Sequence, residues 1–513
     1  MNERHRHFLY LQKFEFQYAE PYSRLFLTDD QKIDREACMK ILGKLHLNFL
    51  CCLIYGVLSA VNMFFLTRGG ISLSPDSVNY ISIVQIFRIG QWTKAFVLTW
   101  PPLYPISIAL ITFFGFEGAE SARIISVISY SALVIVMFLF AKATAGRLVA
   151  HLTSISMLFF APLLFVYSFC WSETVYITLS AISLLTLNKF YKSTDVMSKR
   201  YLIWGAIFVG LAFLTRYAGV ALFLAGFLVV GFKRGIKLTV DKIKNLVLFS
   251  VITCTPITLY LIGCLYYKGK FVPSANKVVT TLWQSFNLFF STIYHDSLTF
   301  DLRFQGHVVS QQSGVPILLL GKVAGLIFLI LSVMYFLLRL FKKTIKDQVV
   351  PIIYVACYSL FIAYVSTVRY GNFIESRLCS PLYPFIIVLM FFVVIAVCKG
   401  VARRRTKLLF WGASIFAVLF FWSIQSGSTV NLYMQMAAPE APMVEHRDIT
   451  GDGIIDVSDL MYLINYLYKG GPQPRPLENA NVNCDATIDM TDVLFLANYI
   501  YKSGPPPCNL ADH

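Results

Sequence analysis

The stretch Leu47–Pro102 decides the fold: LNFLCCLIYGVLSAVNMFFLTRGGISLSPDSVNYISIVQIFRIGQWTKAFVLTWPP. Its first part, Leu47–Leu66, is an apolar run of the ~20-residue length that spans a bilayer. A loop follows in which Asp76 is the single acid, and then an amphipathic run, Val78–Phe96, suited to lie at the membrane face. Asp is a good N-cap for a helix that begins near Val78. However, a carboxylate near lipid is costly, which makes Asp76 a functional candidate.

The rest of the chain repeats this apolar pattern. Of the 513 residues, 57% are hydrophobic and only 14% are charged, which excludes a soluble protein. The sequence predicts an all-α, polytopic helical membrane protein with about 11–13 spans. Pro102–Gly115 is short for a full crossing and is expected either to dip into the membrane and return or to lie in the interface. The predicted spans lie near residues 47–66, 122–141, 148–169, 173–190, 200–214, 217–232, 245–266, 315–341, 349–367, 381–398 and 408–425.

The distribution of charge predicts the topology. The net charge is +16, yet from Glu445 onward ten acidic residues outnumber four basic ones. Basic residues concentrate in alternate connections, which places those connections and residues 1–46 in the cytoplasm. The protein is therefore expected in the cell membrane as a multi-pass protein, with a cytoplasmic N-terminus and an extracytoplasmic tail. The basic excess is a topology signal, so nucleic acid is not an expected partner.

With this topology, seven ionisable side chains map to the outer face of the membrane. Each has a structural interpretation: Arg216 as a snorkelling residue, Glu173 as a helix cap, and Arg377 as a partner of a nearby acid. Seven such groups on one face, beside two proline-rich loops, nevertheless favour a shared polar pocket. The seven are Asp76, Lys94, Glu173, Arg216, Arg369, Glu375 and Arg377.

The order of short motifs along residues 47–425 resembles the GT-C membrane glycosyltransferases, closest to the protein O-mannosyltransferase and aminoarabinose-transferase branch of glycosyltransferase family 39. The motifs are the external loop with a lone Asp, then Pro-Pro-Leu-Tyr, Ser-Glu before a span, Leu-Thr-Arg-Tyr-Ala-Gly, and Glu-Ser-Arg followed by Pro-Leu-Tyr-Pro. The resemblance implies an inverting transferase that passes a sugar from a polyprenyl-phosphate donor to an acceptor at the outer face.

The same resemblance assigns roles to particular residues. It implies that Asp76 is catalytic and that Lys94, Glu173, Arg216 and Arg377 bind substrate. A positioned carboxylate can act as the base that deprotonates an acceptor hydroxyl, and Arg binds and stabilises a phosphate leaving group. Asp76 stands alone where protein mannosyltransferases usually have an Asp-Glu pair, which counts against a protein acceptor. The acceptor, whether protein, lipid or glycan, stays open, as does a divalent metal at this site.

The composition of the chain changes after Gln425, where the long apolar runs end. A linker, 426–444, leads to a tail, 445–513, that contains two copies of one pattern at an offset of 33 residues. The copies begin at Asp448 and Asn481, and each is followed by a short helix. Oxygen-bearing side chains at loop positions 1, 3, 5, 9 and 12 are typical of EF-hand-type calcium loops.

This tail resembles a small, α-helical dockerin domain with two EF-hand-type loops, which implies bound Ca²⁺ and a cohesin-like partner. The second loop, with Asn481 at position 1 and Ala486 in place of glycine, is expected to bind calcium more weakly. Outside the cytoplasm, Cys484 and Cys508 can form a disulfide. The implied ligands are Asp448, Thr450, Asp452, Ile454, Asp456 and Asp459 in the first loop, and Asn481, Asn483, Asp485, Thr487, Asp489 and Asp492 in the second.

Two other classes of function remain possible from the sequence. A multi-span transporter with an extracytoplasmic interaction module has a similar number of spans, but transporters place their charges near the midplane of paired repeats. Here the charges lie at one face, and no such repeat is found in the membrane part. A membrane part that only anchors the tail needs a single span. The enzyme is therefore the preferred interpretation.

Overall fold

The structure is a computed structural model, and the part of the chain that it describes has gaps. Several residues named in the predictions lie outside the described part of the chain: Lys94, Arg369, Glu375, the span 315–341, Asp452 and Ile454. The described residues are 29–88, 90, 100–193, 197–233, 240–268, 289, 292, 302–304, 307–310, 347–365, 376–400, several positions between 411 and 433, 448–451, 455–474, 476–485, 487–502 and 505–508.

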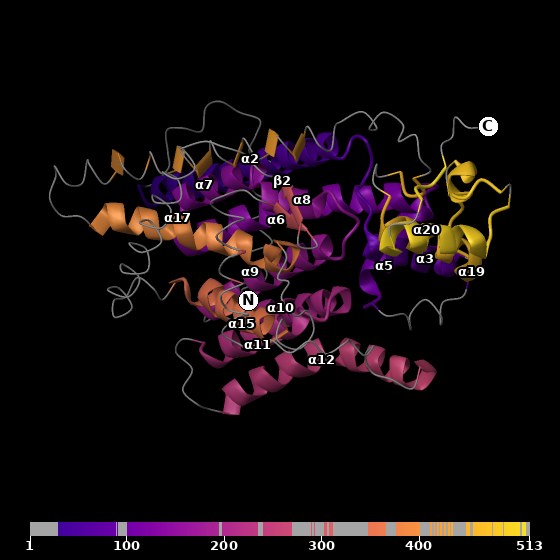
Figure 1. Ribbon diagram of the computed structural model, residues 1–513. Coiled ribbons are helices and arrows are strands. Elements are labelled where there is room, and N and C mark those ends of the chain that lie inside the picture. Colours follow the sequence, from indigo (N-terminus) through magenta and orange to yellow (C-terminus); the bar gives the residue numbers. More distant parts are fainter. Residues whose placement is uncertain are drawn as a thin grey trace, which may run out of the picture. The chain divides into compact units, whose positions relative to one another are not determined.

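The described elements are almost all helical (Figure 1). The helices before the tail are α2 (Asp29–Leu66), α3 (Pro75–Arg88), α5 (Leu103–Thr112), α6 (Gly118–Ala145), α7 (Arg147–Leu158), α8 (Ala161–Tyr167), α9 (Glu173–Lys192), α10 (Met197–Thr215), α11 (Gly219–Gly231), α12 (Val240–Lys268), α15 (Val349–Val365), α16 (Ser376–Cys379), η5 (Ser380–Leu382) and α17 (Tyr383–Gly400). The strands β1 (Leu302–Phe304) and β2 (His307–Ser310) form an antiparallel pair, a short exception to the all-α prediction. The tail contains α19 (Val457–Lys469), η6 (Leu477–Ala480) and α20 (Met490–Lys502).

The helices confirm a polytopic membrane protein. Among the described residues, five helices are long and apolar enough to cross a membrane, or six if one bent pair counts as a span. Further apolar helices are shorter, including α5, whose ten residues extend ~15 Å, half the thickness of the hydrocarbon core. Because the predicted span 315–341 and part of 408–425 lie outside the described residues, the count of 11–13 stays a prediction.

Helix α9 lies between α6 and α10 (Figure 1) and is more polar than the spans around it. Some of its hydroxyl groups bond within the helix: Ser180 Oγ donates to the carbonyl of Tyr176, and Ser183 Oγ donates to that of Ser180. Thr178 Oγ1 also lies within hydrogen-bonding distance of the Ser129 carbonyl in α6. Such bonds let polar side chains be buried without an unpaired donor. Gly205 of α10 allows the close approach, because a Cβ there would lie 2.8 Å from Leu187 of α9.

The predicted span 148–169 is not one continuous helix. It is divided into α7 and α8, which meet at an angle of 58°. The break lies at Phe159 and Phe160, just before Pro162 in the first turn of α8. Proline cannot donate the backbone hydrogen bond that would continue α7, and it fits the first turn of a new helix. The bend positions residues 168–172, which carry part of the site described below.

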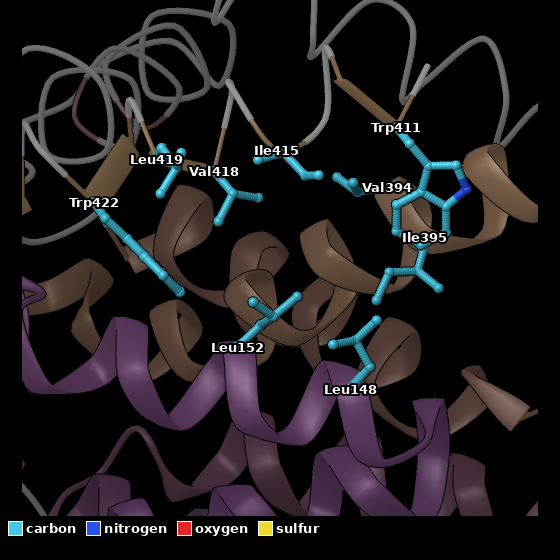
Figure 2. A pocket seen from close by; sticks show the side chains of 9 residues that line it. All are labelled: Leu148, Leu152, Val394, Ile395, Trp411, Ile415, Val418, Leu419 and Trp422. Carbon is cyan, nitrogen blue, oxygen red and sulfur yellow. The ribbon is translucent and has the colours of Figure 1, made fainter. Parts of the chain in front are cut away.

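An apolar cavity of about 220 Å³ lies where α7 and α17 meet the side chains of Trp411, Ile415, Val418, Leu419 and Trp422. Figure 2 shows Leu148 and Leu152 of α7 directed toward the side chains of the other segments. All nine lining residues are apolar, and none of the charged residues predicted at the outer face is among them. The cavity offers a hydrocarbon environment but no group able to perform acid–base chemistry.

The tail is a pair of packed helices, α19 and α20 (Figure 1, yellow). Leu460 and Leu463 of α19 are buried together with Val493 and Leu496 of α20. Ala480 and Val482 complete this small core. Cys484 and Cys508, whose pairing the sequence left open, form a disulfide with 6.2 Å between their Cα atoms. Small domains depend on such additional constraints.

Candidate active site and calcium loops

The loop before α3 is attached to the loop that follows α8. The backbone of Ser72 accepts a hydrogen bond from the amide of Cys170 and donates one to the carbonyl of Ser168, both at 2.9 Å. Ser77 Oγ donates to the carbonyl of Cys170 at 2.9 Å. These bonds join segments about a hundred residues apart in sequence, and they place Asp76, in the first turn of α3, next to the start of α9.

Trp171 contributes the aromatic ring against which Arg377 packs. Its indole is buried, and its Nε1 donates to Ser74 Oγ at 2.7 Å. The guanidinium of Arg377, from α16, lies over the ring at 4.5 Å from the centroid. A guanidinium in this position is attracted by the negative face of the ring, more strongly when water is excluded. Trp171 therefore packs against the flat face of the Arg377 guanidinium, and the carboxylates of Asp76 and Glu173 contact the guanidinium at its edges.

Four charged side chains form a chain of ion pairs, Asp76–Arg377–Glu173–Arg216. Arg377 Nη2 lies 2.5 Å from Asp76 Oδ2, and Arg377 Nε donates to Glu173 Oε1. Glu173 Oε2 lies 2.6 Å from Arg216 Nη1. Four separate segments contribute these groups: α3, α9, the turn after α10, and α16. Positive and negative charges alternate, so each charge has an opposite neighbour.

Burial differs strongly along this chain of ion pairs. The Glu173 side chain is 1% exposed, whereas Asp76 is 23% exposed. The exposures of Arg377 and Arg216 lie between these values, at 12% and 15%. A buried charge is tolerated only when it is paired and hydrogen-bonded, and two guanidinium groups do this for Glu173. Glu173 is thus the fixed centre of the site, and Asp76 is its accessible end.

Two hydroxyl groups that were not among the predicted residues complete the site. Ser172 Oγ accepts from Arg216 Nη1 at 3.2 Å and lies 3.0 Å from the hydroxyl of Tyr80. Tyr80 belongs to α3 and is fully buried. Ser172 directly precedes Glu173, so the Ser-Glu motif held a signal for it, but no pattern in α3 sets Tyr80 apart from a core residue.

The structure brings together four of the five predicted transferase-site residues, and Lys94 lies outside the described residues. Helix α3 begins at Pro75 rather than near Val78, and Asp76 pairs with Arg377. Arg216 is not a simple snorkelling residue, because it pairs with a buried acid. The pairing of Arg377 with Asp76, foreseen as one structural interpretation, is observed. Whether these residues act on a substrate stays a prediction.

The first tail loop is organised by Asp459, at position 12. Its Oδ1 accepts from the amides of Ile449 and Thr450 at 2.9 and 2.8 Å, and its Oδ2 accepts from the amide of Asp456 at 2.9 Å. Thr450 Oγ1 also lies 3.2 Å from Asp448 Oδ1. Burial raises the pKa of Asp459 to about 7, and the nearby Asp448 carboxylate adds to this shift. A cation beside these oxygens would favour the ionised form.

The second loop repeats this geometry 33 residues later. Asp492 accepts from the amides of Asn483 and Asp489 at 3.3 and 3.0 Å, as Asp459 does at the corresponding positions of the first loop. Asp485 lies at the centre of an oxygen-rich group and accepts from Thr487 Oγ1 at 2.9 Å and from Thr491 Oγ1 at 3.1 Å. The Thr487 amide also donates to Asp485 at 3.0 Å, and this bond, together with the two hydroxyl bonds, holds the pKa of Asp485 below its usual value. Thr491 was not among the predicted ligands.

The donor set of the loops fits calcium, a hard cation that prefers oxygen ligands. In the described residues, which omit 452–454 and 486, no three His, Cys, Asp or Glu side chains form a metal-holding group by themselves. Thr450 and Asn483 provide the further oxygens of their loops. The acids also have structural roles, because Asp456 caps α19 in a capping box. Calcium binding is therefore proposed because the oxygen atoms of the two loops match the ligands that calcium prefers.

The disulfide accounts for an irregular residue in the second loop. Gly451, at position 4 of the first loop, has a φ of +73°, and Cys484, at position 4 of the second, has a φ of +59°. This left-handed conformation suits glycine and costs a residue with a side chain ~1 kcal/mol or more. The bond to Cys508 holds Cys484 in place, and the Cys508 amide donates to the carbonyl of Val482 at 3.1 Å. This covalent link constrains the loop whose glycine at position 6 is replaced by Ala486.

Fold and site together define a polytopic helical membrane protein that has a partly buried cluster of paired acids and arginines and a small C-terminal helical domain. Residues 99–260 match the family described as dolichyl-phosphate-mannose-protein mannosyltransferase. Residues 446–501 match the dockerin type I domain. Both matches support the two resemblances that the sequence motifs predict, that of the membrane part to GT-C glycosyltransferases and that of the tail to dockerin domains. Comparison with curated protein sequences gives no significant match.

Three solved structures match this chain in part, each at low sequence identity. ArnT from Cupriavidus metallidurans in the apo state has 14% identity and a TM-score of 0.48, over 77% of this chain and 78% of that chain. The same protein bound to undecaprenyl phosphate has 17% identity and a TM-score of 0.46, with the same coverage of both chains. The Archaeoglobus fulgidus oligosaccharyltransferase, tethered to an acceptor peptide, has 12% identity and a TM-score of 0.40, over 73% of this chain and 55% of that chain.

Calcium is expected to protect the tail of the full-length protein from protease. Chelator should accelerate tryptic cleavage after Lys469, at the end of α19, because four acids of the first loop repel one another without a cation. Asp459→Asn should lose this protection, whereas Glu478→Gln, in η6 and outside both loops, should keep it. Equal cleavage rates with calcium and with chelator in the wild-type protein would contradict a calcium-stabilised tail.

Proposed function

We propose that the membrane part transfers a sugar from a polyprenyl-phosphate donor to an acceptor at the outer face of the membrane, with inversion. The observation that carries this proposal is the cluster Asp76–Arg377–Glu173–Arg216. It combines a partly exposed carboxylate with two arginines in one site. The description of the matched family, which names a dolichyl-phosphate-linked mannose, supports a lipid-phosphate donor.

In this reaction the carboxylate of the cluster accepts a proton, and the arginines stabilise the electron pair that remains on the leaving phosphate. Asp76 accepts the proton of the acceptor hydroxyl while the acceptor oxygen forms a bond to the anomeric carbon. The bond from that carbon to the phosphate oxygen breaks, and its electron pair remains on the phosphate. Arg377, and Arg216 behind it, stabilise the growing negative charge. Attack from the side opposite the leaving group inverts the anomeric configuration.

Glu173 has a different role in this proposal from the one the resemblance implies. Its carboxylate is buried and occupied by two arginines, so it positions them rather than contacting the substrate. Lys94 stays a proposed substrate-binding residue. The sugar and the acceptor, whether protein, lipid or glycan, are left open.

The tail is proposed to bind calcium through its two loops and to recruit a cohesin-like partner. Its disulfide supports a location outside the cytoplasm, since such bonds persist in oxidising compartments. Together with the charge distribution, this favours a protein of the cell membrane with a cytoplasmic N-terminus and an extracytoplasmic tail.

The direct test is to incubate the purified full-length protein with radiolabelled polyprenyl-phosphate sugars and a membrane extract. Transfer of label from the lipid to a second product supports the proposal, and loss of this transfer in the Asp76→Asn variant assigns it to the site. If no polyprenyl-phosphate sugar is consumed by protein that is folded by thermal melting, the proposed donor class is wrong.

Arginine geometry at position 377 is expected to matter as well as its charge. Arg377→Lys should retain part of the transfer activity, and Arg377→Ala should lose more, because lysine keeps the charge but not the planar fork that contacts Asp76 and Glu173 together. The measurement is the dependence of initial rate on donor concentration for both variants. Identical donor dependence in wild-type protein and both variants would show that Arg377 only supports the fold.

A further inference from the structure

The charges of the cluster balance before any substrate is present. Arg216 and Arg377 are matched by Asp76 and Glu173, and each guanidinium already contacts a carboxylate. An arriving phosphate is itself an anion and needs a guanidinium as its partner. It must therefore take the place of one of the two carboxylates or remain without a strong contact in this cluster.

The two carboxylates are not equally easy to displace. Glu173 is 1% exposed and binds both arginines, so moving it would leave Glu173 and Arg216 without ion-pair partners and Arg377 with Asp76 alone. Asp76 is 23% exposed and contacts Arg377 through a single Nη2. The Nη2 edge of Arg377 is thus the place where an incoming anion can replace the carboxylate of Asp76. The Nε edge stays attached to Glu173, and Trp171 keeps the guanidinium plane in position.

We infer that Asp76 and the phosphate of the donor compete for Arg377, so that arrival of the donor releases Asp76 to act as the base. This inference rests on the proposed function. Without donor, the Asp76–Arg377 pair holds the carboxylate away from acceptor hydroxyls. With donor, the phosphate occupies Arg377, and Asp76 becomes available beside the sugar. After the product phosphate leaves and Asp76 gives its proton to water, the pair forms again.

The test measures binding separately from transfer. The dissociation constant of radiolabelled undecaprenyl phosphate is measured on immobilised full-length protein in detergent, and sugar transfer is measured on the same preparations. Asp76→Asn should bind the lipid phosphate about tenfold more tightly than wild-type protein, equivalent to ~1.4 kcal/mol. Glu120→Gln, which removes one exposed acid in the first turn of α6, should leave binding and transfer unchanged.

A second comparison tests whether the effect acts through Arg377. In an Arg377→Lys background, adding Asp76→Asn should improve binding by less than in wild type, because the competed guanidinium is absent. An equal gain in both backgrounds overturns the inference, as does unchanged or weaker binding in Asp76→Asn. Asp76→Ser serves as the second variant if the Asn protein does not fold. If Asp76→Asn transfers sugar at the wild-type rate, Asp76 is not the base and the inference fails, whatever the binding result. The proposed function itself fails only if wild-type protein consumes no polyprenyl-phosphate sugar.

Discussion

Asp76→Asn is expected to lower the rate of sugar transfer by ~10²–10⁴-fold, the usual contribution of a general base. The change keeps the size of the side chain and its ability to contact Arg377, but an amide cannot accept the acceptor's proton. Because Asp76 is partly exposed and lies in the first turn of α3, the protein should still fold. The measurement is the single-turnover rate with a labelled polyprenyl-phosphate sugar at saturating donor, which separates chemistry from binding.

The matched control for this experiment is Glu120→Gln, which loses one acid at the start of α6 without touching the cluster. It should transfer sugar at the wild-type rate and melt at the same temperature. An Asp76→Asn variant with near-wild-type turnover would remove Asp76 as the base, even if the rest of the cluster binds the donor.

Glu173→Gln is expected to cause the largest loss of stability, ~3–5 kcal/mol. The substitution leaves Arg216 and Arg377 partly buried with only Asp76 as an acidic partner in the cluster. Removing one charge from a buried ion network leaves the remaining charges uncompensated. This loss destabilises the folded state by more free energy than the ion pair had contributed to its stability. The apparent melting temperature of the detergent-solubilised full-length protein should fall by several degrees, and activity should fall with it.

Asp347→Asn is the control for Glu173→Gln. Asp347 lies 3.2 Å from the ammonium of Lys192, and its side chain is 52% exposed. Exposed pairs of this kind contribute ~0–1 kcal/mol, so the melting temperature should change little. If the two variants melt at the same temperature, the buried position of Glu173 carries no special stability, and its role as the fixed centre of the site is refuted.

Membrane class and tail architecture were predictable from sequence because both depend on local patterns. An apolar run such as Leu47–Leu66 has to match the thickness of the bilayer, so its length identifies it. The 33-residue offset predicted two loop–helix units, and the shared hydrogen bonds of Asp459 and Asp492 confirm that the units are equivalent. The rarity of charge in an apolar chain also pointed to Asp76 and Arg377 as site candidates.

Local pattern was less reliable where packing decides the outcome. The run 148–169 is apolar enough for one span, but Pro162 and the surrounding helices divide it into α7 and α8. Helix α9 is polar by composition, and only its position between α6 and α10 explains how its hydroxyl groups are buried. In both cases the hydrophobic pattern describes the environment of a segment and does not specify its partners.

Sequence alone thus determined that this is a membrane protein with a repeated, oxygen-rich tail, and which charged residues are candidates for its site. Only the tertiary structure decided how those charges pair. Asp76 and Arg377 are separated by 301 positions, and Glu173 lies between them in sequence but meets both arginines in space. Side-chain contacts between distant segments depend on helix packing and loop closure, which no local pattern encodes. For this reason the difference between the buried Glu173 and the accessible Asp76 became visible only in the folded protein.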